Sequence, residues 1–313
     1  MKRILTVLLI IMLVLSLCAC GPVAVDDGRL HVVTTVFPLY DWTREILGSA
    51  DAELTLLLDK GVDLHSYQPT AEDIVKLSSC DVFIYIGGES DEWVDDALKQ
   101  ATNPDMIVVK LMDCLGDALV EEETVEGMQA EEEEEEAFDE HVWLSLRNAQ
   151  TCCEAICDAL CQADEANADT YKDNAYLYGK KLEELDGRYN AYVDIARFKT
   201  LLVADRFPFR YLAEDYHLRY YAAFSGCSAE SEASFETVSF LAGKLSELNL
   251  PAVVILDGSD GKIAETVIQT AGVEVGTVRL DSMQSVTAAD LAETSYLAVM
   301  EQNLDALTTA LGG

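Results

Sequence analysis

Short apolar runs rich in β-branched residues alternate with segments of helical periodicity, and this alternation limits the possible folds more than any other feature of the chain. Such an alternation is typical of a parallel sheet covered by helices. The strands expected in the first half are residues 31–37, 52–58, 81–88 and 106–113. The helices expected between them are residues 39–48, 70–79 and 91–101, the second with Thr70 as its N-cap.

The same texture returns in the second half, after a long helical stretch. Residues 147–195 have helical periodicity almost throughout, with a polar break near residues 164–167. The part from 168 to 196 would span about 40 Å, which suits a rod between two lobes. The strands expected after it are residues 200–205, 220–224, 252–258 and 274–281. The expected helices are residues 209–217, 234–249, 262–272 and 288–312.

These patterns predict an α/β protein of two Rossmann-like lobes, each a mostly parallel sheet flanked by helices, joined by one long backbone helix. We place the N-terminal lobe at residues 30–165, the linking helix at 166–196 and the C-terminal lobe at 197–313. Ligands of such sheets bind beyond the carboxyl ends of the strands. The crevice between the two lobes is therefore the expected binding site.

The N-terminal residues indicate export. Lys2 and Arg3 precede an apolar run. The basic residues and the run together match a secretory signal peptide at residues 1–19. The run ends in LCAC, which resembles a bacterial lipobox with Cys20 as the lipidated residue; a plain secretory cleavage site is the alternative. With lipidation, residues 20–29 form a tether that holds the protein in the cell envelope, on the outer face of the cytoplasmic membrane.

The charge balance excludes nucleic acid as a partner. The chain carries 57 acidic against 21 basic residues, whereas binding to a phosphate backbone needs clustered Lys and Arg. The charge is densest in an acidic loop at residues 121–137, which we expect to be solvated and disordered. Such a surface is compatible with a cationic ligand and equally with a simple solvated spacer.

Seven cysteines follow Cys20, so at least one of them is expected to be free, modified or paired with another molecule. A disulfide between Cys80 and Cys114 is conceivable in an exported protein, but the sequence does not assign it. The cysteines at 153, 157 and 161 have helical spacing and share one face. We favour a stripe of small core residues over a thiolate cluster, because the segment lacks the paired CxxC spacing of common zinc sites.

Polar residues follow several of the expected strands at their carboxyl ends. His65 lies in the loop after the second strand, and His141 lies at the far end of the acidic loop. In the second lobe, Asp205 ends one strand, and Asp257 and Asp260 follow another. Two imidazoles with two or three carboxylates around one crevice are a ligand set for a divalent transition metal, with zinc as the first choice.

Five segments carry a resemblance to a known family, in the right order and over nearly the whole mature chain. They are GVDLHSYQPTAEDIVKL (61–77), IGGESDEW (86–93), DEHVWLSLRNA (139–149), ADRFPFRYLAEDYHL (204–218) and SGCSAESEASFE (225–236). They resemble segments of the solute-binding receptors of zinc and manganese ABC importers, the cluster A-I (cluster 9) family. The resemblance implies two α/β lobes joined by one long helix, in agreement with the alternation described above.

The resemblance also implies a metal site, although one position departs from the family pattern. His65 and His141 fall on the first two ligand positions. The third is usually His or Glu, but here it is Arg206, which cannot coordinate a cation. The neighbouring Asp205 would serve after a shift of one residue. Asp260 falls on the fourth position, unless it only caps the helix that follows, and Asp257 is a near alternative.

By this resemblance the chain is an extracytoplasmic lipoprotein that binds Zn²⁺ between its lobes and delivers it to an ABC permease and its ATPase. We expect a monomer that performs no catalysis, since the sequence contains no HExxH motif and no nucleophile elbow. One alternative is a receptor for manganese or iron, because carboxylates favour Mn²⁺ somewhat. Another is a metal-binding surface adhesin without a role in transport.

Overall fold

The N-terminal lobe is built on a parallel sheet. The computed structural model describes residues 28–129, 137–228 and 232–313, so the signal peptide and the predicted lipidation site Cys20 lie outside the described residues. The strands of this first sheet are β1 (Leu30–Thr34), β2 (Ala52–Leu56), β3 (Val82–Tyr85) and β4 (Ile107–Lys110). They lie side by side in the order β2-β1-β3-β4, and every pair is parallel.

The C-terminal lobe repeats this topology. Its strands are β5 (Thr200–Phe207), β6 (Arg219–Ser225), β7 (Ala252–Leu256) and β8 (Gly276–Leu280). Their order is β6-β5-β7-β8, again with parallel pairs. In both sheets the direction of strand addition reverses beside the first strand of the lobe, and ligands of such folds bind at this switch point.

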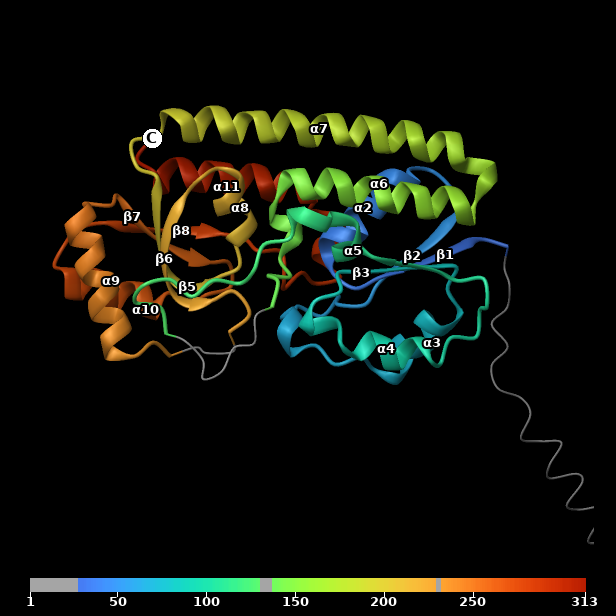
Figure 1. Cartoon of the computed structure of the whole chain (residues 1–313), viewed down its shortest axis with the longest axis horizontal. Coiled ribbons are helices and arrows are strands. Elements are labelled where there is room, and N and C mark those ends of the chain that lie inside the picture. Colours follow the sequence, from blue (N-terminus) through green and yellow to red (C-terminus); the bar gives the residue numbers. More distant parts are fainter. Residues whose placement is uncertain (1–27, 130–136, 229–231) are drawn as a thin grey trace, which may run out of the picture.

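Helices cover the sheets and connect the lobes. The N-terminal half contains α2 (Phe37–Leu47), α3 (Ala71–Ser79), α4 (Trp93–Leu98), α5 (Leu111–Leu115) and α6 (Leu146–Ala163). The remainder contains α7 (Ala168–Ile195), α8 (Arg210–Asp215), α9 (Phe235–Leu248), α10 (Lys262–Ala271) and α11 (Tyr296–Ala310). Figure 1 shows α7 running along both lobes, with α6 and α11 beside it. The predicted fold class, with its long connecting helix, is confirmed. Among the described residues, no helix has the length and apolarity that crossing a membrane requires.

The two lobes share one hydrophobic core near α11. Tyr296 is fully buried and packs edge-on against Trp42, with ring centroids 5.1 Å apart. Its hydroxyl donates to the carbonyl of Trp143 at 2.6 Å, and the Trp143 indole donates to the carbonyl of Ser282 at 2.8 Å. Because Trp143 stands two residues after His141, these contacts fix the position of that histidine at the boundary between the lobes.

Local sequence rules explain most element boundaries, and tertiary contacts explain the exceptions. Thr70 caps α3 as predicted, in a reciprocal capping box with Asp73. The prediction that the last helix starts at residue 288 is wrong: α11 begins at Tyr296, after Ser295 as N-cap. The strand predicted at 106–113 is also shorter, because α5 begins immediately after Lys110.

The acidic loop is partly ordered. For residues 121–129 the prediction of disorder is wrong, because Glu121 bridges to Phe138 and Gln129 bridges to Phe224. The backbone N–H of Gln129 donates to the carbonyl of Ala223, on the edge strand β6, at 2.9 Å. Backbone pairing with an otherwise open sheet edge offsets the cost of ordering this polar segment. Residues 130–136, which include the whole run of six glutamates, lie outside the described residues.

All seven cysteines that the structure describes are free thiols. Cys80, which is buried, and Cys114, which is exposed, do not form the disulfide that was conceivable from the sequence. Cys153 and Cys157 face the core beneath α6, as predicted for a stripe of small residues. Within the described ranges, the stripe belongs to no cluster of potential metal ligands.

Candidate metal centre

His141 stands at the lobe boundary with one ring nitrogen held in place. It is fully buried and directly precedes a short 3₁₀ helix, Val142–Leu144. One carboxylate oxygen of Asp139 accepts both the backbone N–H of His141, at 2.8 Å, and a bond from His141 Nδ1, at 2.9 Å. These two bonds orient the ring so that Nε2 is the nitrogen left for a ligand.

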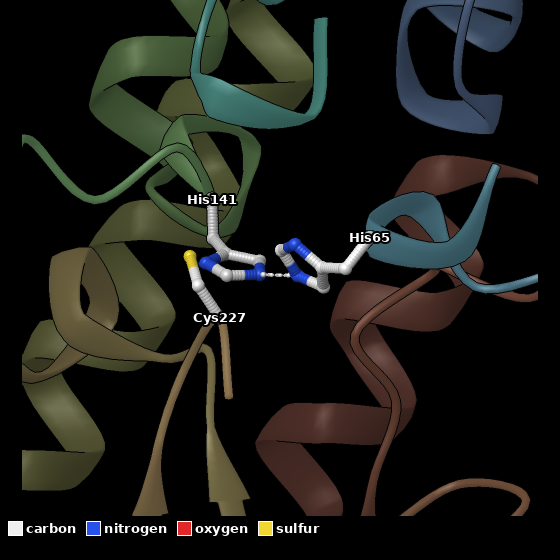
Figure 2. A group of neighbouring side chains, drawn as sticks. All are labelled: His65, His141 and Cys227. Carbon is white, nitrogen blue, oxygen red and sulfur yellow. Dashed lines mark hydrogen bonds between the residues drawn. The ribbon is translucent and has the colours of Figure 1, made fainter. Parts of the chain in front are cut away.

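His65 faces His141 from the N-terminal lobe. It lies in a 3₁₀ helix, Leu64–Ser66, which Asp63 caps by accepting the His65 backbone N–H. His65 Nδ1 lies 3.0 Å from a carboxylate oxygen of Glu140 and 2.9 Å from the Ser90 hydroxyl. The two Nε2 atoms are 3.3 Å apart, and Figure 2 shows the rings meeting through them. The structure therefore brings the first two predicted ligands together.

The carboxylates beside the rings favour positive charge at this point. Burial alone lowers the pKa of His141, but Asp139, Glu140 and Glu122 raise it, and the net pKa lies above the usual value of histidine. Burial likewise raises the pKa of Glu140, but the hydrogen bond from His65 and the charge on His141 lower it more. A bound cation would take the place of the imidazole protons in this arrangement.

Gln284 contacts both imidazoles through its side-chain amide. The amide nitrogen lies 3.0 Å from His65 Nε2 and 2.9 Å from His141 Nε2, while its oxygen accepts a bond from the Ser282 hydroxyl at 2.8 Å. When the rings are neutral, the two amide protons require an acceptor nitrogen on each ring. Both histidines then carry their proton on Nδ1, which is the tautomer that presents Nε2 to a metal.

Cys227 completes the strongest group of potential ligands. Among the described residues, only His65, His141 and Cys227 offer three ligand atoms that all lie within 4.8 Å of one another. Cys227 follows β6, and Figure 2 shows its sulfur beside the His141 ring. The sequence analysis did not select Cys227 as a ligand. It could have done so, because Cys227 follows the carboxyl end of a strand, and the other candidates were chosen for that position.

The predicted carboxylate ligands of the second lobe lie next to this group and not within it. Asp205, Asp257 and Asp260 line a cavity of about 940 Å³ that His65 also borders. Asp260 accepts the backbone N–H of Lys262 at 3.1 Å and pairs with the ammonium of the same lysine. Asp260 thus bonds the first residue of α10 from outside the helix, while Gly261 is the N-cap residue.

Arg206 occupies the third position of the expected ligand pattern and ties the lobes together. Its guanidinium lies 2.6 Å from the carboxylate of Asp63, which belongs to the opposite lobe. Burial alone would raise the pKa of Asp63, but the hydrogen bond and the charge of Arg206 lower it by more. The net pKa is therefore below the usual value of aspartate, and the carboxyl is ionised. The guanidinium of Arg206, paired with Asp63, therefore occupies the position where a metal ligand was expected.

Curated relatives match the chain over most of its length. The zinc-binding lipoprotein AdcA of Streptococcus pneumoniae strain R6 is 32% identical over 312 residues, which cover 98% of this chain and 60% of the relative. The high-affinity zinc uptake system protein ZnuA of Bacillus subtilis is 28% identical, with 95% of this chain and 94% of the relative covered. The chain thus spans about three fifths of the length of AdcA.

Solved structures support the same assignment. The Zn(II)-bound ZnuA-like domain of Streptococcus pneumoniae AdcA superposes with a TM-score of 0.72 at 28% identity, covering 91% of this chain and all of that domain. The periplasmic zinc-binding protein TroA of Treponema pallidum, at 23% identity and a TM-score of 0.75, shares the fold. A family model, described as the periplasmic component A of the zinc-uptake complex, matches residues 32–310. The chain therefore belongs to this family of zinc-uptake components.

Proposed function

We propose that the chain is an extracytoplasmic receptor that binds Zn²⁺ between its lobes and delivers it to the permease and ATPase of an ABC importer. The observation that carries this proposal is the meeting of two imidazole nitrogens, Nε2 of the partly buried His65 and Nε2 of the fully buried His141, 3.3 Å apart. Each ring has its other nitrogen held by a carboxylate, which is how proteins orient histidines that ligate zinc.

Further parts of the proposal rest on sequence. Lipidation at Cys20 would hold the receptor at the outer face of the membrane, where a permease can accept its cargo. Asp205 and Asp260 stay predictions as ligands; in the structure they border the cavity beside His65, where their charge favours the approach of a cation. No step of this function needs a reacting substrate, so the receptor is not an enzyme in this proposal.

Calorimetry on metal-stripped protein tests the proposal directly. We expect micromolar or tighter zinc binding with one ion per chain, and its loss when His65→Ala and His141→Ala are combined. His217→Asn is the matched control, because His217 has a positive φ that asparagine tolerates and belongs to no ligand group in the described chain. Unchanged affinity in the double variant would refute the proposed site. Growth of a deletion strain under zinc chelation tests the transport role.

A further inference from the structure

The departure at the third ligand position raises the question of what completes the coordination of the ion. Zinc sites in proteins are almost always four-coordinate, and two imidazoles alone leave a buried divalent charge poorly compensated. Arg206 cannot contribute, because its guanidinium is a cation already engaged by Asp63. A further ligand has to come from another residue at the lobe boundary.

We propose that Cys227 supplies this ligand as a thiolate, so that the cargo ion is held by two imidazoles and one sulfur. This inference rests on the proposed function and specifies its site. The Cys227 sulfur, His65 and His141 form the only group of three potential ligands within 4.8 Å in the described parts of the chain. The ligands come from both lobes, since Cys227 follows β6 in the C-terminal lobe.

The turn that carries Cys227 is packed directly on the histidine. A methyl group placed on Gly226 would lie 3.2 Å from His141 Cε1 and 3.0 Å from the carbonyl of Phe207, so only glycine fits without displacement. The backbone N–H of Cys227 donates to a carboxylate oxygen of Glu122 at 3.0 Å. The glycine lets the turn approach the His141 ring closely, and the Glu122 bond anchors the backbone of the cysteine there; neither feature depends on the sulfur.

Binding through sulfur has a defined chemical balance. The thiol loses its proton to solvent as the metal–sulfur bond forms, and no oxidant or reductant is required. The thiolate supplies one negative charge toward the divalent ion, and the carboxylates of Asp139 and Glu140 place further negative charge behind the histidines. Soft thiolate ligands favour Zn²⁺ over Mn²⁺, so Cys227 would make the site select zinc against the alternative cargo.

Cobalt substitution tests the inference. Bound Co²⁺ gives visible ligand-field bands with any ligands, but gives a near-ultraviolet sulfur-to-metal charge-transfer band only when a thiolate coordinates. We expect that band in the full chain and in the control Cys161→Ser, whose thiol lies 3.9 Å from that of Cys157 on α6. Cys227→Ser should lose the band while keeping the ligand-field bands.

Affinity measurements give the second readout. Loss of a residue that only hydrogen-bonds a metal ligand weakens metal binding by about 10- to 100-fold. Since Cys227 would be a ligand itself, we expect Cys227→Ser to weaken zinc binding at least about tenfold. Manganese binding should weaken less. A ligand-field spectrum without a sulfur band in the unmodified chain, or a sulfur band that persists in Cys227→Ser, would overturn the inference while leaving the receptor function intact. The absence of any cobalt or zinc binding would overturn both.

Discussion

Replacing Asp139 by asparagine removes one charge beside His141 while keeping the shape of the side chain. Asp139 is 1% exposed, and one of its oxygens accepts both bonds from His141. Asparagine retains an oxygen that accepts both bonds, and its amide nitrogen takes the place of the second carboxylate oxygen, which has no partner among the described residues. Asp139→Asn therefore leaves His141 in position and changes mainly the charge behind it.

We expect Asp139→Asn to weaken zinc binding by about 10- to 100-fold, the range typical for loss of a carboxylate that orients a metal-ligating histidine. This corresponds to about 1.4–2.8 kcal/mol. The assay is competition for zinc with a chromogenic chelator at fixed pH. Asp73→Asn is the control, since Asp73 is also buried but accepts its hydrogen bonds from Thr70 and Tyr67 and from neither histidine. A change of less than twofold in both variants would refute the role assigned to Asp139.

Three further predictions follow from contacts in and around the site. Gln284→Ala removes the amide whose protons face both histidines, so we expect tighter zinc binding in calorimetry; weaker binding would show instead that the amide oxygen serves as a ligand. Arg206→Met breaks the ion pair with Asp63 between the lobes, so we expect a loss of about 1 kcal/mol in urea unfolding, whereas the exposed Arg188 changed to Met should lose only a few tenths. Burial raises the pKa of Asp91 to about 7, so the folded state binds the proton more tightly than the unfolded state. The protonated carboxyl therefore stabilises the folded state at low pH, and this stabilisation is lost as pH rises from about 4 to 7. Asp91→Asn should make the free energy of unfolding less dependent on pH in that window, and larger than that of the parent protein at pH 8. An unchanged pH dependence of unfolding in the variant would contradict this assignment.

The sequence predicted the fold well because the relevant signals are local. β-branched runs such as residues 82–85 are buried on both faces, and this leaves a parallel sheet as the consistent solution. His65 and His141 were predicted as ligands in the same way, since each follows a strand or a loop that ends at the crevice, and the structure brings their rings together. The N-cap of α3 needed only Thr70 and Asp73, three residues apart.

The missed residues depend on contacts between distant segments. Cys227 lies more than 80 residues from His141 along the chain, and although it follows a strand end, no spacing relates it to the histidines. Its backbone is anchored by Glu122, from a segment that composition alone assigns to disordered loops. The edge strand β6 orders that segment by pairing with Gln129, and no property of residues 121–129 taken alone predicts this.

These contacts give the acidic segment a role beyond that of a solvated spacer. Glu122 belongs to the stretch that leads from the N-terminal lobe to His141, yet it holds the turn of Cys227 in the C-terminal lobe. The Asp63–Arg206 pair also joins the lobes, in the lining of the cavity that His65 borders. Since the proposed ligands come from both lobes, any movement that opens the crevice must separate Cys227 from the histidines or break the Glu122 bond. Release of the ion is then coupled to lobe motion through a backbone contact as well as through the metal itself.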